Sequence, residues 1–301
     1  MNILVTGAAG LVGTALTAHL TQNKHHVIRM VRKAQAAPGE IRWDPYAETI
    51  DAEALEGLDA VIHLAGENIA TGRWTARKKI LIRESRIHGT RFLSQCLARL
   101  FDPPKVLVSV SAVGFYGDRG EISLDEESRP GKGFLAEVCR DWEAAAAPAL
   151  MRGIRVVHPR LGMVLSTEGG ALARMLPAFR LGIGGRIGSG RQYMSWLSID
   201  DLVGIIDYAI HDSSMHGPVN AVSPTPVTNQ DFSLTLARLL SKPSFLALPA
   251  FAARMVFGEM ADALLLASAR VLPARLKDSG YKFQFPELEN ALRHALKTPA
   301  R

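Results

Sequence analysis

The sequence predicts an α/β protein: a Rossmann-type, doubly wound parallel sheet with a smaller C-terminal α/β lobe. Two observations predict this fold class. A glycine-rich turn follows directly on the apolar run at residues 3–5 and leads into a helix-like segment, as the first turn of such a sheet does. Strand-like and helix-like segments then alternate through the first half of the chain, which is typical of crossover units between parallel strands.

The first turn holds three glycines, and each has its own expected role. Gly7 makes the tight turn, Gly10 lets the backbone approach a phosphate without an intervening Cβ, and Gly13 lets the helix pack closely on its strand. The backbone N–H groups of Leu11 and Val12 open the helix, at the position where a pyrophosphate binds. The turn therefore predicts a dinucleotide site. The alternative is an ordinary strand-to-helix turn, because glycines occur in many of them.

The other strands expected in the first half are short and almost continuously apolar. They lie at residues 27–31, 60–64, 106–110 and 156–157, and a long amphipathic segment at 78–100 separates the second of these from the third. Strands of a parallel sheet have this composition because helices cover both faces of the sheet. We therefore expect residues 1–165 to form the dinucleotide-binding Rossmann domain.

The second half of the chain has a different composition. Glycine and proline become frequent after residue 160, notably in the segment 182–190, and helices are expected at 199–211 and 229–240. Loops carried on a rigid scaffold commonly hold substrate contacts. We therefore expect residues 166–301 to form mainly a substrate-binding lobe, with 196–211 returning to the Rossmann core.

The end of the second strand predicts which dinucleotide is bound. Proteins that prefer NAD place a carboxylate there, on the 2′-hydroxyl of the adenine ribose. In this chain Val31 takes that position, and Arg32 and Lys33 follow. A guanidinium offers a planar fork that matches phosphate oxygens. We therefore expect NADP(H) as the cofactor, with a basic loop that touches no ligand as the alternative.

The composition narrows the classes of partner. Lys and Arg number 35 against 29 Asp and Glu, a formal net charge of +6, and this mild excess favours anionic small molecules as readily as nucleic acid. No nucleic-acid-binding motif accompanies the densest basic run, at residues 73–79. We therefore expect a small-molecule substrate and no nucleic acid. A monomer and a homodimer both remain open.

The same sequence argues for a cytoplasmic protein without a metal. Cys96 and Cys139 cannot build a disulfide framework and have no metal-ligand spacing. An apolar strand follows Met1 in place of a charged leader, and the apolar stretch at 264–266 is too short to cross a bilayer. We therefore expect neither export nor membrane contact.

Further motifs are spread over the whole chain. They are Leu64-Ala65-Gly66-Glu67-Asn68-Ile69, Arg73-Trp74, Ser85-Arg86, Val113-Gly114-Phe115-Tyr116-Gly117, Trp142-Glu143, Gly188-Ser189-Gly190-Arg191-Gln192 and Asn220-Ala221-Val222-Ser223-Pro224. With them the chain closely resembles the nucleoside-diphosphate-sugar epimerase-like branch of the extended and atypical short-chain dehydrogenase/reductase superfamily, whose members are often called epimerase family proteins. The resemblance implies an NADP(H)-dependent oxidoreductase or epimerase-like activity on a small carbonyl, hydroxy or nucleotide-sugar compound.

The chain departs from this superfamily at its catalytic pair. Typical members use Tyr and Lys spaced YxxxK, in which the Lys lowers the pKa of the Tyr and the Tyr moves the proton. Alignment on Glu143 places Leu135 at the Tyr position and Cys139 at the Lys position. An NADPH-responsive regulatory or binding protein without turnover is therefore the alternative to an enzyme, since a fold alone does not imply activity.

The resemblance also implies roles for individual residues. Ser111, after the strand at 106–110, takes the position of the hydroxyl donor, and Tyr116 offers a nearby phenol; a turn residue and a packing residue are the alternatives. The residues expected to contact the cofactor are Gly7, Gly10, Leu11, Val12, Gly13, Val31, Arg32, Leu64, Ala65, Gly66, Arg86 and Arg160. Those expected to hold the substrate are Arg191, Gln192 and Trp196. Cys139 is expected to be a small core residue.

Overall fold

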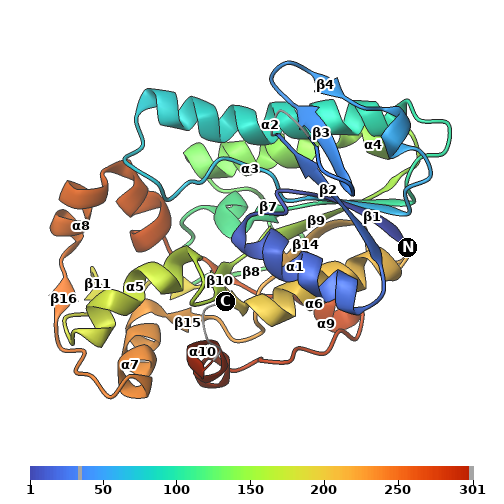
Figure 1. Cartoon of the computed structure of the whole chain (residues 1–301). Helices are drawn as coiled ribbons and strands as arrows, with labels where there is room; N and C mark the ends of the chain where they lie inside the picture. Colours follow the sequence, from blue (N-terminus) through green and yellow to red (C-terminus); the bar gives the residue numbers. More distant parts are fainter. Residues whose placement is uncertain (33–35, 298–301) are drawn as a thin grey trace.

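The computed structural model describes residues 1–32 and 36–297, and Lys33 lies outside them. A central sheet runs through the molecule in the order β14-β9-β6-β5-β1-β2-β3-β4 (Figure 1). Its strands are β1 (Asn2–Thr6), β2 (His26–Val31), β3 (Glu40–Asp44), β4 (Thr49–Ile50), β5 (Ala60–His63), β6 (Val106–Ser109), β9 (Arg155–Leu161) and β14 (Gly217–Ala221), and β7 (Ser111–Ala112) pairs with β9. The succession β3-β2-β1-β5-β6-β9 is the doubly wound Rossmann order, so the predicted fold class is confirmed.

Each apolar run predicted to be a strand forms one, and its side chains alternate between the two faces of the sheet. Ile3 and Val5 pack into one cluster of buried residues, whereas Leu4 packs into another on the opposite face. Val61 and Ile62 of β5 divide between the two clusters in the same way. Both faces of the sheet are therefore covered, which explains why these strands lack a polar side.

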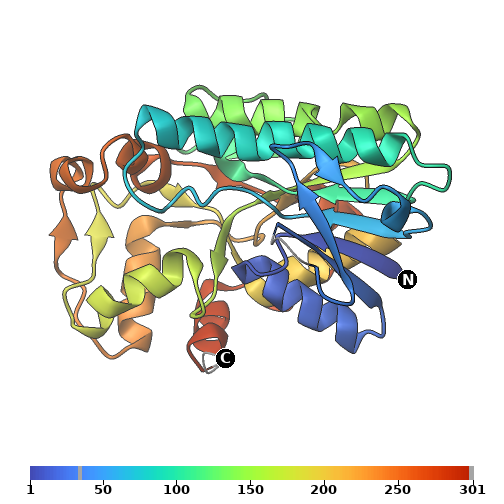
Figure 2. The same cartoon turned by 45° about the horizontal axis from the view of Figure 1, so that its top comes forward.

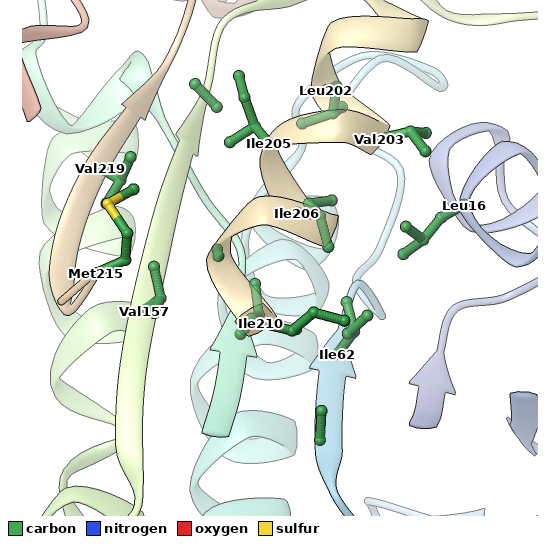
Figure 3. Close-up of a cluster of buried hydrophobic side chains, with 14 of the residues drawn as sticks. Leu16, Ile62, Val157, Leu202, Val203, Ile205, Ile206, Ile210, Met215 and Val219 are labelled. Atoms are coloured by element: carbon green, nitrogen blue, oxygen red, sulfur yellow. The ribbon is translucent and has the colours of Figure 1, made fainter. Parts of the chain in front are cut away.

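Helices cover the two faces. On one face lie α1 (Leu11–Gln22) and α6 (Ile199–His211), and on the other lie α2 (Ala76–Ala98), α3 (Phe134–Ala144) and α4 (Ala147–Met151). Figure 2 shows α2 and α3 side by side above the sheet. Figure 3 shows Leu202, Val203 and Ile206 of α6 packed beside Leu16 and Ile62. α6 thus supplies one of the helices that cover the sheet.

Four strands of the sheet were not anticipated from the sequence: the two-residue strands β4 and β7, and the longer β3 and β14. β3 has alternating burial and carries charged residues, so it lacks the continuous apolar run of the other strands. β14 contains Pro218 and Asn220 and pairs only with β9, as a strand at the edge of a sheet can. The return of the second half to the sheet therefore extends to Ala221.

The rest of the second half forms a helical lobe with short strand pairs. Its elements are β10 (Met163–Leu165), α5 (Gly170–Arg180), β11 (Arg186–Ile187), β12 (Tyr193–Met194), β13 (Trp196–Ser198), β15 (Val227–Thr228), α7 (Asn229–Leu239), β16 (Ala247–Leu248), α8 (Ala250–Phe257), the π-helix Ala261–Leu266, β17 (Arg270–Val271), α9 (Ala274–Asp278) and α10 (Leu288–Lys297). β17 pairs with β8 (Ser123–Leu124). Within residues 1–32 and 36–297, none of the helices is long and apolar enough to cross a membrane.

A buried carboxylate fastens the C-terminal segment to α6. Asp201 is fully buried, and its oxygens accept hydrogen bonds from Gln284 N at 2.6 Å and Phe285 N at 3.0 Å. The Ser198 hydroxyl caps the helix by accepting from Asp201 N at 3.0 Å. Asp201 therefore organises the backbone around it and is not available as a catalytic acid.

Candidate functional site

The turn between β1 and α1 requires its glycines. Gly7 has a φ of +68°, and a Cβ there would lie 2.9 Å from the backbone of Leu64 and Ala65. A Cβ on Gly13 would overlap the Gly7 carbonyl oxygen and lie 2.7 Å from the Cα of Ala8. A side chain at either position would displace backbone atoms. The turn therefore lies tightly between the ends of β1 and β5.

Gly10 differs from its two neighbours because space is open beside it. The one atom within 4 Å of a Cβ built there is the Gly7 carbonyl oxygen, at 3.3 Å. Gly10 is the N-cap of α1, with no side-chain cap and no acidic residue in the first turn. The first N–H groups of the helix, on Leu11 and Val12, thus face an open, electropositive position that fits a phosphate.

A buried hydroxyl joins the carboxyl ends of β1 and β5. Thr6 Oγ1 accepts hydrogen bonds from Leu64 N and Ala65 N, both at 3.1 Å, and shares a hydrogen bond of 2.7 Å with His63 Nδ1. Burial lowers the pKa of His63 to about 4, so its ring is neutral at pH 7. Neither Thr6 nor His63 was expected at the site, although each is a polar residue at the end of an apolar strand.

The other residues assigned to the adenosine half of the cofactor gather at this edge. β1 and β2 are parallel and in register from Asn2 and His26 to Thr6 and Met30. Val31 and Arg32 therefore leave the sheet beside Gly7, and Arg32 is exposed there. Both small residues, Ala65 and Gly66, follow β5 at the same edge. The structure thus brings together the turn, the small residues and an exposed guanidinium.

Arg86 of α2 lies on the far side of this small-residue loop. Its Nη1 donates to the carbonyl oxygens of Glu67, at 3.0 Å, and Ile82, at 3.2 Å, and its Cζ lies 5.0 Å above the ring of Trp142. A Cβ on Gly66 would lie 3.3 Å from that Cζ. Burial lowers the pKa of Arg86, and no ion pair holds it in the described part of the chain. Arg86 is thus a cation supported by backbone carbonyls.

Ser111 and Cys139 lie next to this cation. The Ser111 hydroxyl is buried, and no nitrogen or oxygen of the described residues bonds to it; its polar neighbour is the Cys139 thiol. Burial raises the pKa of that thiol to about 11, with Glu143 adding to the rise and Arg86 opposing it. Cys139 is therefore a protonated core residue at neutral pH, and Ser111 has a hydroxyl with unused bonding capacity.

Tyr116 and Arg160 belong to a buried network. Arg160 donates through Nε and Nη2 to the two carboxylate oxygens of Glu143, both at 2.8 Å, and through Nη1 to the Tyr116 hydroxyl at 2.9 Å. The Tyr116 hydroxyl donates to Asn220 Oδ1 at 2.7 Å, and the guanidinium lies 3.5 Å from the centre of the Phe115 ring. Tyr116 is 0% and Arg160 is 3% exposed. Both side chains are therefore occupied by protein partners, away from open space.

The residues expected to hold the substrate separate into two kinds. Gln192 is buried, and its Nε2 donates to the carbonyl oxygens of Ile187 and Leu265, both at 2.9 Å. Trp196 is fully buried and donates to Thr225 O at 3.0 Å. Arg191 is exposed. The structure thus places two of the three inside the lobe as supports for its loops and leaves the arginine at its surface.

Comparisons with known proteins agree with this architecture. Residues 3–221 match the model of the NAD dependent epimerase/dehydratase family, and residues 248–295 match a domain of unknown function, DUF1731. The epimerase family protein ML0860 of Mycobacterium leprae is 41% identical over 299 residues, 99% of this chain and 97% of that protein. The human epimerase family protein SDR39U1 is 38% identical over 297 residues, 97% of this chain and 99% of that protein.

Solved structures extend the comparison. The crystal structure of human SDR39U1, isoform 2, with NADPH has a TM-score of 0.90 at 36% identity and covers 99% of this chain and 100% of that chain. A nucleoside-diphosphate sugar epimerase from Corynebacterium glutamicum has a TM-score of 0.81 at 41% identity, covering 98% of this chain and 58% of that chain. UDP-N-acetylglucosamine 4-epimerase from Bacillus cereus, with a TM-score of 0.76 at 15% identity, shares the fold.

Proposed function

Because the chain belongs to the NAD dependent epimerase/dehydratase family, we propose that it binds NADP(H) and acts as an epimerase- or reductase-like enzyme on a small carbonyl, hydroxy or nucleotide-sugar compound. The observation that carries the proposal is the turn from β1 to α1. There Gly10 leaves open space in front of an uncapped helix terminus. A pyrophosphate fits such a terminus because free N–H groups and the helix dipole both favour negative charge.

The choice of NADP(H) over NAD(H) rests on the end of β2. Val31 takes the place of the acid that would repel a 2′-phosphate, and the exposed Arg32 follows it. The human relative, 36% identical, was crystallised with NADPH. Both observations support a phosphorylated adenine ribose beside Arg32.

For the chemistry, we assign the hydroxyl role to Ser111. Its buried hydroxyl has no nitrogen or oxygen partner among the described residues, so donation to a substrate oxygen would replace only its weak contact with the Cys139 thiol. When NADP(H) is bound, the nicotinamide supplies the hydride chemistry. Ser111 then orients the reacting oxygen and favours the form in which it carries more negative charge.

Arg86 gives the site a cation in spite of the missing Lys. Cys139 occupies the Lys position of the YxxxK spacing, and its thiol is close enough to the Arg86 guanidinium for each to influence the pKa of the other. The site therefore still has a positive charge near the position of the missing Lys, but α2 supplies it through Arg86, whereas the Lys would lie on α3. Since the pKa of arginine excludes proton abstraction at neutral pH, we assign Arg86 to binding and charge stabilisation.

One observation favours the rival, an NADPH-responsive binding protein without turnover. The Tyr116 hydroxyl, which could have replaced the missing Tyr, is held by Asn220 and Arg160, and burial raises its pKa to about 12. The site thus offers no evident phenol for proton transfer. A protein of this kind would bind cofactor as tightly as an enzyme does and would leave substrates unchanged.

A turnover assay on the full chain distinguishes the enzyme from the binding protein without turnover. NADPH oxidation and NADP⁺ reduction are followed over a panel of carbonyl, hydroxy and nucleotide-sugar compounds, and products are identified by NMR so that epimerisation without net oxidation is also detected. Turnover of one compound class supports the enzyme. Tight NADPH binding with no product from any member of the panel supports the binding protein instead.

A further inference from the structure

A cluster of histidines lies at the opposite edge of the sheet from the cofactor turn. α1 and α6 lie side by side on one face of the sheet (Figure 1), and both end at this edge. α1 has 12 residues, which at 1.5 Å per residue carries its last turn about 18 Å from the glycine turn. His19 is in the last turn of α1, and Asp207 and His211 are in the last turns of α6. His25 follows α1 and precedes β2.

Three side chains of this cluster bring ligand atoms close together, and His19 lies beside one of them. His25, Asp207 and His211 each offer a ligand atom, and these atoms all lie within 4.8 Å of one another. His19 Nε2 lies 3.2 Å from Asp207 Oδ2. In a tetrahedral zinc site with metal–ligand distances near 2.0–2.1 Å, neighbouring ligand atoms are roughly 3.3 Å apart. The spacing thus suits shared coordination of one ion.

Two atoms of the cluster make no hydrogen bond within the described residues, although His211 Nδ1 lies 3.5 Å from one of them, Asp207 Oδ1. Asp207 Oδ1 and His25 Nδ1 are shielded from solvent, and among residues 1–32 and 36–297 neither has a hydrogen-bond partner. A shielded acceptor without a donor is costly in a folded protein. An ion bound between them would satisfy both atoms at once.

From this geometry we propose that His25, Asp207 and His211 bind one divalent late transition-metal ion such as Zn²⁺, with His19 holding the Asp207 carboxylate from beside the site. Imidazole nitrogens with a single carboxylate favour Zn²⁺, Ni²⁺ or Cu²⁺ over Mg²⁺ and Ca²⁺, which prefer oxygen ligands.

The surroundings of the cluster favour a cation. The negative ends of the α1 and α6 dipoles both lie beside it. His19 and His211 are 33% and 50% exposed, so an ion can enter from solvent.

A metal at this place would act on stability. Its ligands are His25, which follows α1, and Asp207 and His211 of α6, so binding would join the ends of the two helices that cover one face of the sheet. An ion that binds the folded chain and not the unfolded one raises stability by mass action. The site is separate from the cofactor turn, so its loss should leave NADPH binding unchanged.

The test uses the full chain, treated with a chelator and dialysed. Titration calorimetry with Zn²⁺ alone should show one ion per chain, and Zn²⁺ at about 100-fold above its Kd should raise Tm by about 5 °C. The His25→Ala, His211→Ala and Asp207→Asn variants should each weaken Zn²⁺ binding by more than about tenfold. Substituted Co²⁺ should give d–d absorption bands without a thiolate charge-transfer band.

Matched controls make the result decisive. His26→Ala removes the adjacent exposed histidine, which contacts Asn2 and lies outside the cluster, and Cys96→Ser removes the more accessible thiol; both should bind Zn²⁺ as the parent chain does. His211 is half exposed, so its alanine variant is expected to fold, and circular dichroism and NADPH binding verify this for every variant. Absence of a one-to-one site in the parent chain, or unchanged affinity in His25→Ala and His211→Ala, overturns the proposal.

Discussion

Arg160 and Glu143 form a two-point ion pair inside the protein, with both N···O distances at 2.8 Å and side chains only 4% and 13% exposed. The pair connects β9 to α3. Through Arg160 it also fixes the Tyr116 hydroxyl, which in turn bonds to Asn220 of β14. One buried ion pair thus links a helix and two strands behind the proposed reaction site.

Removal of one member should destabilise the protein strongly. Glu143→Ala leaves the Arg160 guanidinium buried without its counter-charge, and we expect a loss of about 3–5 kcal/mol in the free energy of unfolding. Urea denaturation measures this. The control is Asp262→Ala, which breaks the exposed Arg254–Asp262 pair, 55% accessible on each side, and should cost less than about 1 kcal/mol. Equal losses in the two variants would contradict a buried role for Glu143.

The cofactor preference should depend on Arg32. A charge-assisted hydrogen bond to the 2′-phosphate contributes about 1.5–3 kcal/mol, so NADPH should bind at least about tenfold more tightly than NADH. Arg32→Ala should remove most of the preference, whereas Arg99→Ala, a loss of the same charge at an exposed position at the end of α2, should keep it. Calorimetric titration of both cofactors checks this. Equal affinities in the parent chain refute the assignment.

Substitutions at two glycines of the turn should affect cofactor binding and stability differently. Gly10 has a φ of −79° and open space beside it, so Gly10→Val should keep the fold while its side chain fills the phosphate position and abolishes NADPH binding. Gly13→Ala should instead lower Tm, because its Cβ meets backbone atoms of the turn. NADPH fluorescence and thermal melts distinguish the two effects. Undiminished binding by Gly10→Val would place the phosphates elsewhere.

If the chain turns over a substrate, Ser111 should matter most. Loss of one positioned donor to a developing oxyanion commonly lowers kcat by ~10²–10³-fold, and we expect this for Ser111→Ala. Ser109→Ala, which removes another buried hydroxyl without a partner in the described structure, should change kcat little, as should Cys139→Ser. A fully active Ser111→Ala excludes the proposed role.

Tyr116→Phe tests whether the buried phenol takes part. The ring stays and the hydroxyl's bonds to Asn220 and Arg160 are lost, so we expect lower stability, of about 1–3 kcal/mol, with kcat reduced less than in Ser111→Ala. A loss of kcat larger than that of Ser111→Ala, without loss of stability, would assign the proton-transfer role to Tyr116.

The protein should become less stable as the pH falls, because His63 binds a proton more readily in the unfolded chain. Burial lowers the pKa of His63 from 6.5 to about 4, so between these values the unfolded chain binds a proton that the folded protein does not. The free energy of unfolding therefore decreases as pH falls from 6.5 to 4, by about 3 kcal/mol over the whole window. Urea denaturation across this range measures the slope. His63→Gln should flatten it in part, because the pKa values of His25 and His158 are lowered as well.

The sequence predicted those helices and strands that are determined by the residues within the segment itself. The strand before Gly7 and the helix at Ile199–His211 form as expected, because the spacing of apolar residues within each segment indicates its secondary structure. β3 and β14 were missed because polar residues, Pro218 among them, interrupt their apolar pattern. Pairing with a neighbour, rather than local composition, makes these two segments strands.

The candidate site divides in the same way. The roles of Gly7 and Gly13 followed from their spacing, since the turn is contained in seven residues. The partners of Tyr116 did not, because Arg160 and Asn220 lie 44 and 104 positions away along the chain. The histidine cluster was missed for the same reason, as His19 and Asp207 are 188 positions apart. Contacts between distant segments decide whether a polar side chain is free or occupied.

The sheet that begins with β1 is complete only when β14 joins it, and one of its faces is fully covered only when α6 packs beside α1. During synthesis, the apolar face formed by Ile3, Val5 and Ile62 therefore stays partly exposed until about residue 221 has left the ribosome. A fragment cut at residue 165 would carry the whole glycine turn and yet expose that face and the edge of β9. The nucleotide-binding half of this chain is consequently not expected to fold independently, and a fragment of residues 1–165 expressed by itself should aggregate.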